Sequence, residues 1–336
     1  MTQYETPEKA PQAVSRLGLY LPTGLLLLLA VGWSGFWFFV SNKTDEAIAG
    51  WMATEKASGR TWECGGKEIG GYPFRIELRC ASIKFSSAQM KADLGAFRAV
   101  TQIYSPKLIL ADVSGPLQIN SAGVQNIFSW ANMRVSLRFN GALERFSMNI
   151  TDVQAGEVVG AALVSAKMME LHLRTDTGRP SEDKAIDVVM NVNDLRASGL
   201  DNLIGNTDAA TLNLSGTITQ ALGLRVGNWQ TGLEHWRAQN GQIFFENARL
   251  AKGPFSIEGK GALDLDQAHR IQGELMVGAR GVGPIVSRFV SGNAAQLAGA
   301  LLVRKDGSAV ELPLRMRDGR VSFGPLRTGP ILAPLY

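Results

Sequence analysis

Cys64 and Cys80 are the residues of this chain whose type and spacing best support a defined chemistry, the formation of a disulfide bond. They would close a loop of about fifteen residues, and such a bond stabilises a fold by about 3 kcal/mol. Two buried free thiols in a reducing cytoplasm are the alternative. The apolar segment upstream argues against free thiols, because it would deliver the domain to a compartment where disulfides persist. We therefore predict a Cys64–Cys80 disulfide.

Other chemically active patterns are missing from the sequence. Its histidines are far apart and share no metal-ligand spacing; they are His172, His235 and His269. No nucleophile elbow and no phosphate-binding Walker loop occurs. Asp264 and Asp266 alternate with apolar residues, which is typical of the solvated face of a strand. We predict no catalytic residue, no metal, no cofactor and no enzymatic activity.

Composition indicates a folded, glycine-rich chain. The sequence has 336 residues, 45% of them hydrophobic and 19% charged, with 37 glycines. Its net charge is only +4, and no basic block is interleaved with aromatic residues, so we do not expect nucleic acid as a partner.

The N-terminal region predicts a membrane anchor. Residues 1–16 are polar and read as a cytoplasmic tail, whereas residues 17–40 carry no charge and are long enough to span a bilayer as a helix. A cleaved signal peptide is the alternative, with residues 47–49 as a processing site. That site lies several residues past the apolar run, so we favour an uncleaved, single-pass anchor.

Residues 41–58 predict a short amphipathic linker helix. Thr44 is a candidate N-cap, and Ile48, Trp51 and Met52 share one face. This face would lie either on the bilayer surface or on the folded domain, and the sequence leaves both open.

Residues 59–336 predict an extracytoplasmic β-rich domain that begins with the cysteine hairpin. Tyr72, Phe74, Ile76 and Leu78 would point inward there, while the residues between them, including Glu77, would face water. Alternating segments follow along the chain. They predict a mainly β fold, an antiparallel, curved or sandwich-like sheet with a few short helices. A break near residues 196–228 would divide it into two sub-modules.

Helical patterns interrupt the strands twice. Asn228 is a candidate cap for a helix with Trp229, Leu233 and Trp236 on one face, which we interpret as core. Residues 281–303 predict two further short helices, and both segments would cover part of one sheet face.

The strands of residues 241–278 would point one apolar set inward, which we take as candidate lipid-binding residues: Phe255, Ile257, Leu263, Leu265, Leu275 and Val277. This segment resembles the C-terminal β-rich modules of AsmA-like envelope proteins. With GRTWEC, GGYPFRIELRC and the Asp-Gly hairpins near the C-terminus, the chain also resembles a bacterial family known as domain of unknown function 2125. That resemblance implies a single-pass anchor and a β-rich envelope domain, and the AsmA-like one implies work on envelope lipids or outer-membrane assembly.

The leading functional hypothesis is a non-enzymatic protein of the bacterial inner membrane with its C-terminal domain in the periplasm. Its partners would be the bilayer that holds the anchor and a phospholipid or other envelope lipid on an apolar sheet surface. The alternative is a scaffold whose sheet closes on itself and which acts through envelope protein partners. A hydrolase with an unrecognised site is the third. An open apolar face favours lipid, whereas a filled sandwich favours the scaffold.

Overall fold

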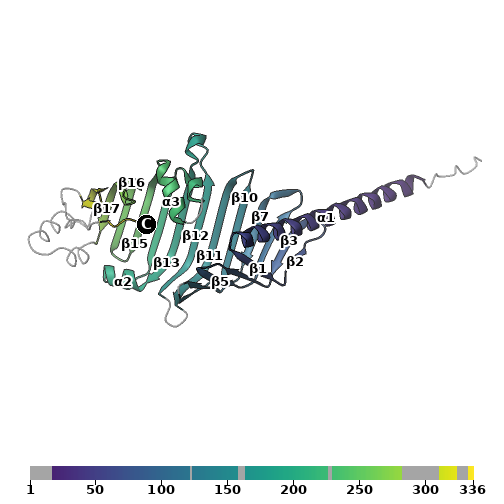
Figure 1. The fold of residues 1–336 in the computed structure, drawn as a ribbon, viewed down its shortest axis with the longest axis horizontal. Coiled ribbons are helices and arrows are strands. Elements are labelled where there is room, and N and C mark those ends of the chain that lie inside the picture. The colour runs from purple at the N-terminus through teal and green to yellow at the C-terminus, as the bar shows by residue number, and fades with distance from the viewer. Residues whose placement is uncertain (1–16, 122, 158–162, 226–228, 282–309, 324–331) are drawn as a thin grey trace, which may run out of the picture.

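The computed structural model describes residues 17–121, 123–157, 163–225, 229–281, 310–323 and 332–336. It consists mostly of one large antiparallel sheet, with an apolar helix, α1, that projects from one end of the molecule (Figure 1). The predicted fold class is confirmed. The predicted tail, the cap at Asn228 and, apart from Gly281, the helices of residues 281–303 lie outside the described residues.

The N-terminal half contains α1 and the first ten strands. They are α1 (Leu17–Ala57), β1 (Thr61–Gly65), β2 (Glu68–Gly70), β3 (Arg75–Cys80), β4 (Ser82–Ser86), β5 (Met90–Leu94), β6 (Phe97–Gln102), β7 (Ser105–Val113), β8 (Leu117–Ser121), β9 (Val124–Ser129) and β10 (Asn132–Phe139).

The C-terminal half contains longer strands and short helices. They are β11 (Leu143–Glu157), β12 (Val164–Thr175), η1 (Ser181–Asp183), β13 (Ile186–Ala197), α2 (Ser198–Ile204), β14 (Ala210–Ile218), η2 (Ala221–Arg225), α3 (Trp229–Ala238), β15 (Ile243–Lys252), β16 (Phe255–Leu265), β17 (Ile271–Arg280), β18 (Val310–Arg317) and β19 (Arg320–Phe323).

The helix α1 is unbroken from Leu17 to Ala57 and is long and apolar enough, by length and composition, to cross a membrane. The predicted linker helix is therefore part of α1, and the prediction of an N-cap at Thr44 is wrong. The Thr44 hydroxyl instead donates a hydrogen bond to the carbonyl of Val40, one turn back (2.9 Å). Because the hydroxyl is bonded within the helix, it does not cap the start of a second helix.

The sheet is a ladder of fourteen strands in the order β2-β3-β6-β7-β10-β11-β12-β13-β14-β15-β16-β17-β18-β19. Neighbouring strands in a sheet lie about 4.8 Å apart, so this ladder is roughly 60 Å long. The strands lie across the long axis of the molecule (Figure 1). β13, β14 and β15 pair in succession across residues 196–228, the region considered as a boundary between sub-modules.

A second branch of strands leaves the ladder at β11. The first part of β11 pairs with β10, whereas residues 154–157 pair with β9, and β9 continues through β8, β5 and β4 to β1. Between these two parts, Asp152 has a left-handed backbone conformation (φ 53°). A single residue of this kind turns a strand out of its plane. The N-terminal half thus has two sheet branches that share one strand.

The helix α3 packs on η2 and against Thr219, the residue that follows β14. Trp236 is buried, and its indole N–H donates to the carbonyl of Thr219 (2.7 Å). The interpretation of Trp236 as core is confirmed. Trp229, interpreted as part of the same core, is exposed, and its ring lies edge-on to that of Tyr336. It lies in the first turn of α3, where the helix has not yet reached the sheet.

The cysteine hairpin differs from its prediction in two ways. β3 begins at Arg75, so Tyr72 and Phe74 lie in the turn before it and are exposed rather than inward. Glu77, predicted to face water, is fully buried. It lies on the outer side of the sheet as the alternation predicts, but arginine side chains cover it.

Candidate functional site

One face of the sheet is apolar along its whole length, as the pairing register shows. A single row of directly paired residues crosses twelve strands, from β3 to β18, without a charged side chain. The row is Leu78, Ala99, Ala111, Val135, Met148, Leu171, Met190, Leu214, Ala248, Gly259, Val277 and Leu312. We call the sheet surface that carries this row the apolar face.

The opposite face is polar along the same twelve strands. The row next to the apolar one, displaced by a single residue, points the other way, since side chains alternate across a sheet. Its members are Arg79, Arg98, Asp112, Arg134, Asn149, Glu170, Asn191, Asn213, Arg249, Glu258, Gly278 and Glu311. The contrast between two adjacent rows separates a polar face of the sheet from an apolar one.

All six candidate lipid-binding residues lie on the apolar face. β16 and β17 pair without a register shift, which places Gly259 opposite Val277, Gly261 opposite Leu275 and Leu263 opposite Gly273. The residues that differ by two along β16 therefore share this face: Phe255, Ile257, Leu263 and Leu265. A glycine thus lies opposite a large apolar side chain at three successive positions of this strand pair, and a Cβ at Gly261 or Gly273 would overlap the backbone of the partner strand.

The apolar face is only partly covered by the described elements. Val277 and Phe255 are buried, at 4% and 6% exposure, whereas Ile257 is 36% exposed and Leu263, Leu265 and Leu275 are half-buried. The same holds for the remaining large side chains of the row, from Leu78 and Met148 to Leu214 and Leu312, which are also half-buried. A core sealed between two layers would bury most of them completely. Within the described part of the chain, this face keeps access for another apolar molecule.

The Cys64–Cys80 disulfide joins the two sheet branches at the end near α1. The sulfur atoms are bonded and the Cα atoms lie 5.2 Å apart, so the prediction is confirmed. Cys80 pairs with Phe97 in the ladder, while Cys64 begins an apolar row of the second branch that continues through Ile83, Leu94 and Leu117. The bond therefore brings apolar rows of the two branches together.

The middle of α1 is docked on the turn between β2 and β3. The indole N–H of Trp33 donates to the carbonyl of Pro73 (2.8 Å), and that of Trp37 donates to the carbonyl of Arg75 (2.9 Å). The hydroxyls of Ser34 and Tyr72 are hydrogen-bonded at 2.8 Å. These bonds fix the domain to the helix, a relationship that neither segment reveals alone, because it depends on carbonyl groups of the turn.

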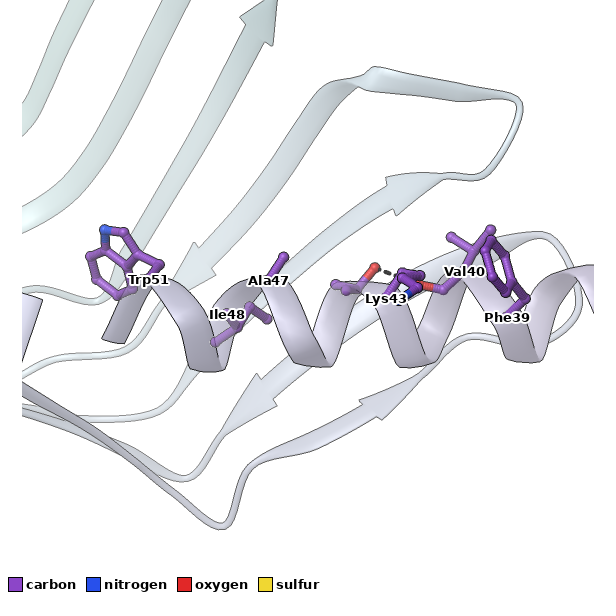
Figure 2. Close-up of a pocket in the computed structure, with 7 residues that line it drawn as sticks. Phe39, Val40, Lys43, Ala47, Ile48 and Trp51 are labelled. Carbon is purple, nitrogen blue, oxygen red and sulfur yellow. Dashed lines mark hydrogen bonds between the residues drawn. The ribbon is translucent and has the colours of Figure 1, made fainter. Parts of the chain in front are cut away.

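A depression of about 490 Å³ follows one side of α1, and Figure 2 shows its side chains along the helix surface. It is lined by Phe39, Val40, Lys43, Thr44, Ala47, Ile48 and Trp51. All seven belong to one helix, and Trp51 also contacts Trp62 of β1 (5.6 Å between ring centroids). The depression is therefore a mostly apolar stretch of one helix surface with a single cation, Lys43, which pairs with Glu46 (2.6 Å).

Two buried charges were missed by the sequence interpretation. Glu77 accepts hydrogen bonds from Arg98 (2.6 Å) and Arg79 (2.7 Å), which together hold its pKa down, at about 2, against the effect of burial. Lys252 lies at an apolar-face position, opposite Phe255, and its ammonium is paired with Asp201 of α2 (2.6 Å). Both are ties between segments distant in sequence. The Arg-x-Glu-x-Arg pattern of residues 75–79, which places three charged side chains on one side of a strand, could have predicted the buried Glu77.

The three histidines lie in unrelated surroundings. His172 is beside the Ser147 hydroxyl, His235 beside the Gln239 amide, and His269 between Glu234 and the ring of Tyr336. Among the described residues, no three acidic, histidine or cysteine side chains are grouped as a metal ion requires.

Comparison with known proteins assigns the family. No curated protein and no solved structure matches the chain, so the similarity to AsmA-like proteins stays a prediction. A family model described as an uncharacterized protein conserved in bacteria does match, over residues 37–331, which begins at Trp37 of α1 and includes both sheet branches. The chain therefore belongs to the family of domain of unknown function 2125 (DUF2125).

Proposed function

We propose that this protein is a non-enzymatic, membrane-anchored envelope protein that holds the acyl chains of lipids on its apolar face. The single observation that carries the proposal is the twelve-strand row of apolar residues beside a polar one, with most of its large side chains incompletely buried. Contiguous exposed apolar surface of more than a few hundred Å² marks a binding surface in soluble domains.

The shape of the face suits a lipid better than a compact ligand. It extends across twelve strands for roughly 50 Å, and the described residues place no charge in the central row. An acyl chain needs only a continuous apolar path, since its favourable free energy comes from burial of methylene groups, about 0.8 kcal/mol each. Polar side chains that would orient a reacting group are not required.

Location in the periplasm, on the bacterial inner membrane, completes the proposal. The helix α1 supplies a segment long and apolar enough for a single span, and the disulfide is consistent with an oxidising compartment. In Figure 1, α1 extends from the end of the molecule that carries β1 and β3. If α1 spans the bilayer, the apolar face begins near the membrane and leads away from it.

Native mass spectrometry of the full-length protein, extracted from the membrane in mild detergent, tests this proposal. We expect co-purified phospholipid or another envelope lipid that remains bound to the domain in the gas phase and is identified after organic extraction. A protein that is free of lipid but retains a stoichiometric protein partner would reject lipid binding and favour the scaffold alternative.

A further inference from the structure

A cluster of exposed aromatic residues surrounds the turn between β2 and β3. Tyr72 is 55% exposed and Phe74 is 61% exposed. Tyr104, in the turn between β6 and β7, is 67% exposed, and the preceding Ile103 donates its backbone N–H to the carbonyl of Phe74 (3.1 Å). Three large aromatic side chains on adjacent turns are thus more than half exposed.

The cluster lies beside the apolar part of α1. Phe74 contacts Trp33, with 6.1 Å between ring centroids, and Tyr72 contacts Trp37 (5.5 Å) and Phe38 (6.3 Å). Trp33 and Trp37 are in the uncharged segment of α1, and the next charge along the chain is Lys43. With a rise of 1.5 Å per residue, Trp33 is about 15 Å from Lys43 along the helix axis, toward the membrane side.

We infer that the Tyr72–Phe74 turn and Tyr104 form a second membrane contact, which inserts into the interface of the bilayer that α1 crosses. Aromatic side chains with a polar atom or a nearby polar backbone favour this zone. The exposed rings on α1 itself, Phe36, Phe38 and Phe39, lie at the same level and complete the aromatic group. The docked indole hydrogen bonds hold the turn at this depth. The inference rests on the proposed membrane span but not on lipid binding by the apolar face.

Photo-crosslinking in a membrane of defined composition tests the contact. Each variant is the full-length protein with p-benzoylphenylalanine in place of one residue. Each is reconstituted alone into vesicles of phosphatidylethanolamine and phosphatidylglycerol. The test positions are Phe74 and Tyr104. Leu27, exposed on α1, reports the span, and Leu110 is the matched control, since it is exposed on β7 about 20 Å along the strand from Tyr104.

We expect lipid adducts, identified by mass, at Phe74 and Tyr104 and at Leu27, with at least a severalfold lower yield at Leu110. Adducts at Leu27 without adducts at either test position would overturn the second contact and leave the anchor intact. Absence of adducts at Leu27 would overturn the anchor and the inference with it. Equal yields at Tyr104 and Leu110 would also reject a contact specific to the turn. Thermal melting of each variant identifies a protein that has lost its fold.

Discussion

Cys64 and Cys80 are bonded across two sheet branches that have no backbone pairing at these strands. β1 pairs with β4, while β3 pairs with β2 and β6. Beside the bond, Ala81, the one residue between β3 and β4, donates its backbone N–H to the carbonyl of Gly65 (2.7 Å). The disulfide therefore reinforces the corner near α1 at which the ladder continues into its branch.

Removal of the disulfide should loosen this end of the domain. We expect the double variant Cys64→Ser, Cys80→Ser to lose about 3 kcal/mol of unfolding free energy, since the unfolded chain regains the freedom of the open loop. Thermal melting with and without reductant checks this. Reductant should lower the melting temperature of the natural protein and leave that of the double variant unchanged. Equal reductant effects on both proteins would contradict the role of this bond.

Acid should destabilise the protein through Glu77. Hydrogen bonds from Arg98 and Arg79 lower its pKa from the ordinary 4.5 to about 2 in the folded chain. Between these values the unfolded state binds the extra proton, so stability is complete above pH 4.5 and declines as the pH falls toward 2. We expect Glu77→Gln to cost about 2 kcal/mol at neutral pH. Urea unfolding at a series of pH values measures the free energy of unfolding. This free energy should fall less steeply with acid in the variant than in the natural protein. An equal slope in both proteins would mean that other carboxylates cause the acid destabilisation.

The sequence predicted the strand periodicity well because one sheet face is apolar and the other polar. Leu263 and Leu265 alternate with Asp264, and that local pattern is enough to place them on opposite faces of β16. The prediction of a solvated face was wrong for the two aspartates: Asp264 has a buried carboxylate oxygen, and Asp266 lies in the turn after β16, where its carboxylate accepts the N–H groups of Ala268 and Arg270. The same pattern could not show that β11 serves two branches, since this depends on distant pairing partners. Glu77 was misplaced for a related reason: alternation sets the side of the sheet but does not reveal that Arg98, from another strand, covers it.

The turn that docks on α1 shows the same limit. Tyr72 and Phe74 continue the alternation of β3, so the sequence predicted a strand that includes them. In the structure, β3 begins only at Arg75, because residues 72–74 form a turn that the N–H of Arg75 closes on the carbonyl of Gly71 (3.1 Å). The carbonyl of Pro73 in this turn accepts the indole N–H of Trp33, a long-range contact that is absent from the local pattern.

Packing of α3 should depend on the absence of a side chain at Gly241. A Cβ at this position would overlap the indole ring of the buried Trp236. Gly241→Ala should therefore displace the ring and cost about 1–3 kcal/mol, the usual range for overpacking. Gly70→Ala is the matched control, because no atom lies within 4 Å of its added Cβ. Chemical unfolding should separate the two variants, and similar stabilities would contradict the tight contact.

Two residues with nearly equal exposure on opposite faces provide the test of lipid binding. Ile257 on β16 is 36% exposed on the apolar face, and Met276 on β17 is 39% exposed on the polar face. Aspartate at either position retains access to water, so we expect both variants to fold. Only Ile257→Asp sets a charge against a bound acyl chain, and an unfavourable change of about 1.4 kcal/mol corresponds to tenfold weaker binding.

Lipid retained per mole of purified protein is the measurement, with Val277→Asp as a third variant. We expect about a tenfold loss for Ile257→Asp, on the basis of that free energy, and natural retention for Met276→Asp. Val277 is 4% exposed, so a carboxylate there is buried without a partner and should lower the melting temperature steeply. If Ile257→Asp instead melts like Val277→Asp, the face is a sealed core at that position. If Ile257→Asp and Met276→Asp both fold and retain equal amounts of lipid, the lipid does not bind at Ile257. A charge on the apolar face would then have no more effect on lipid binding than a charge on the polar face, so the lipid would be bound elsewhere on the protein.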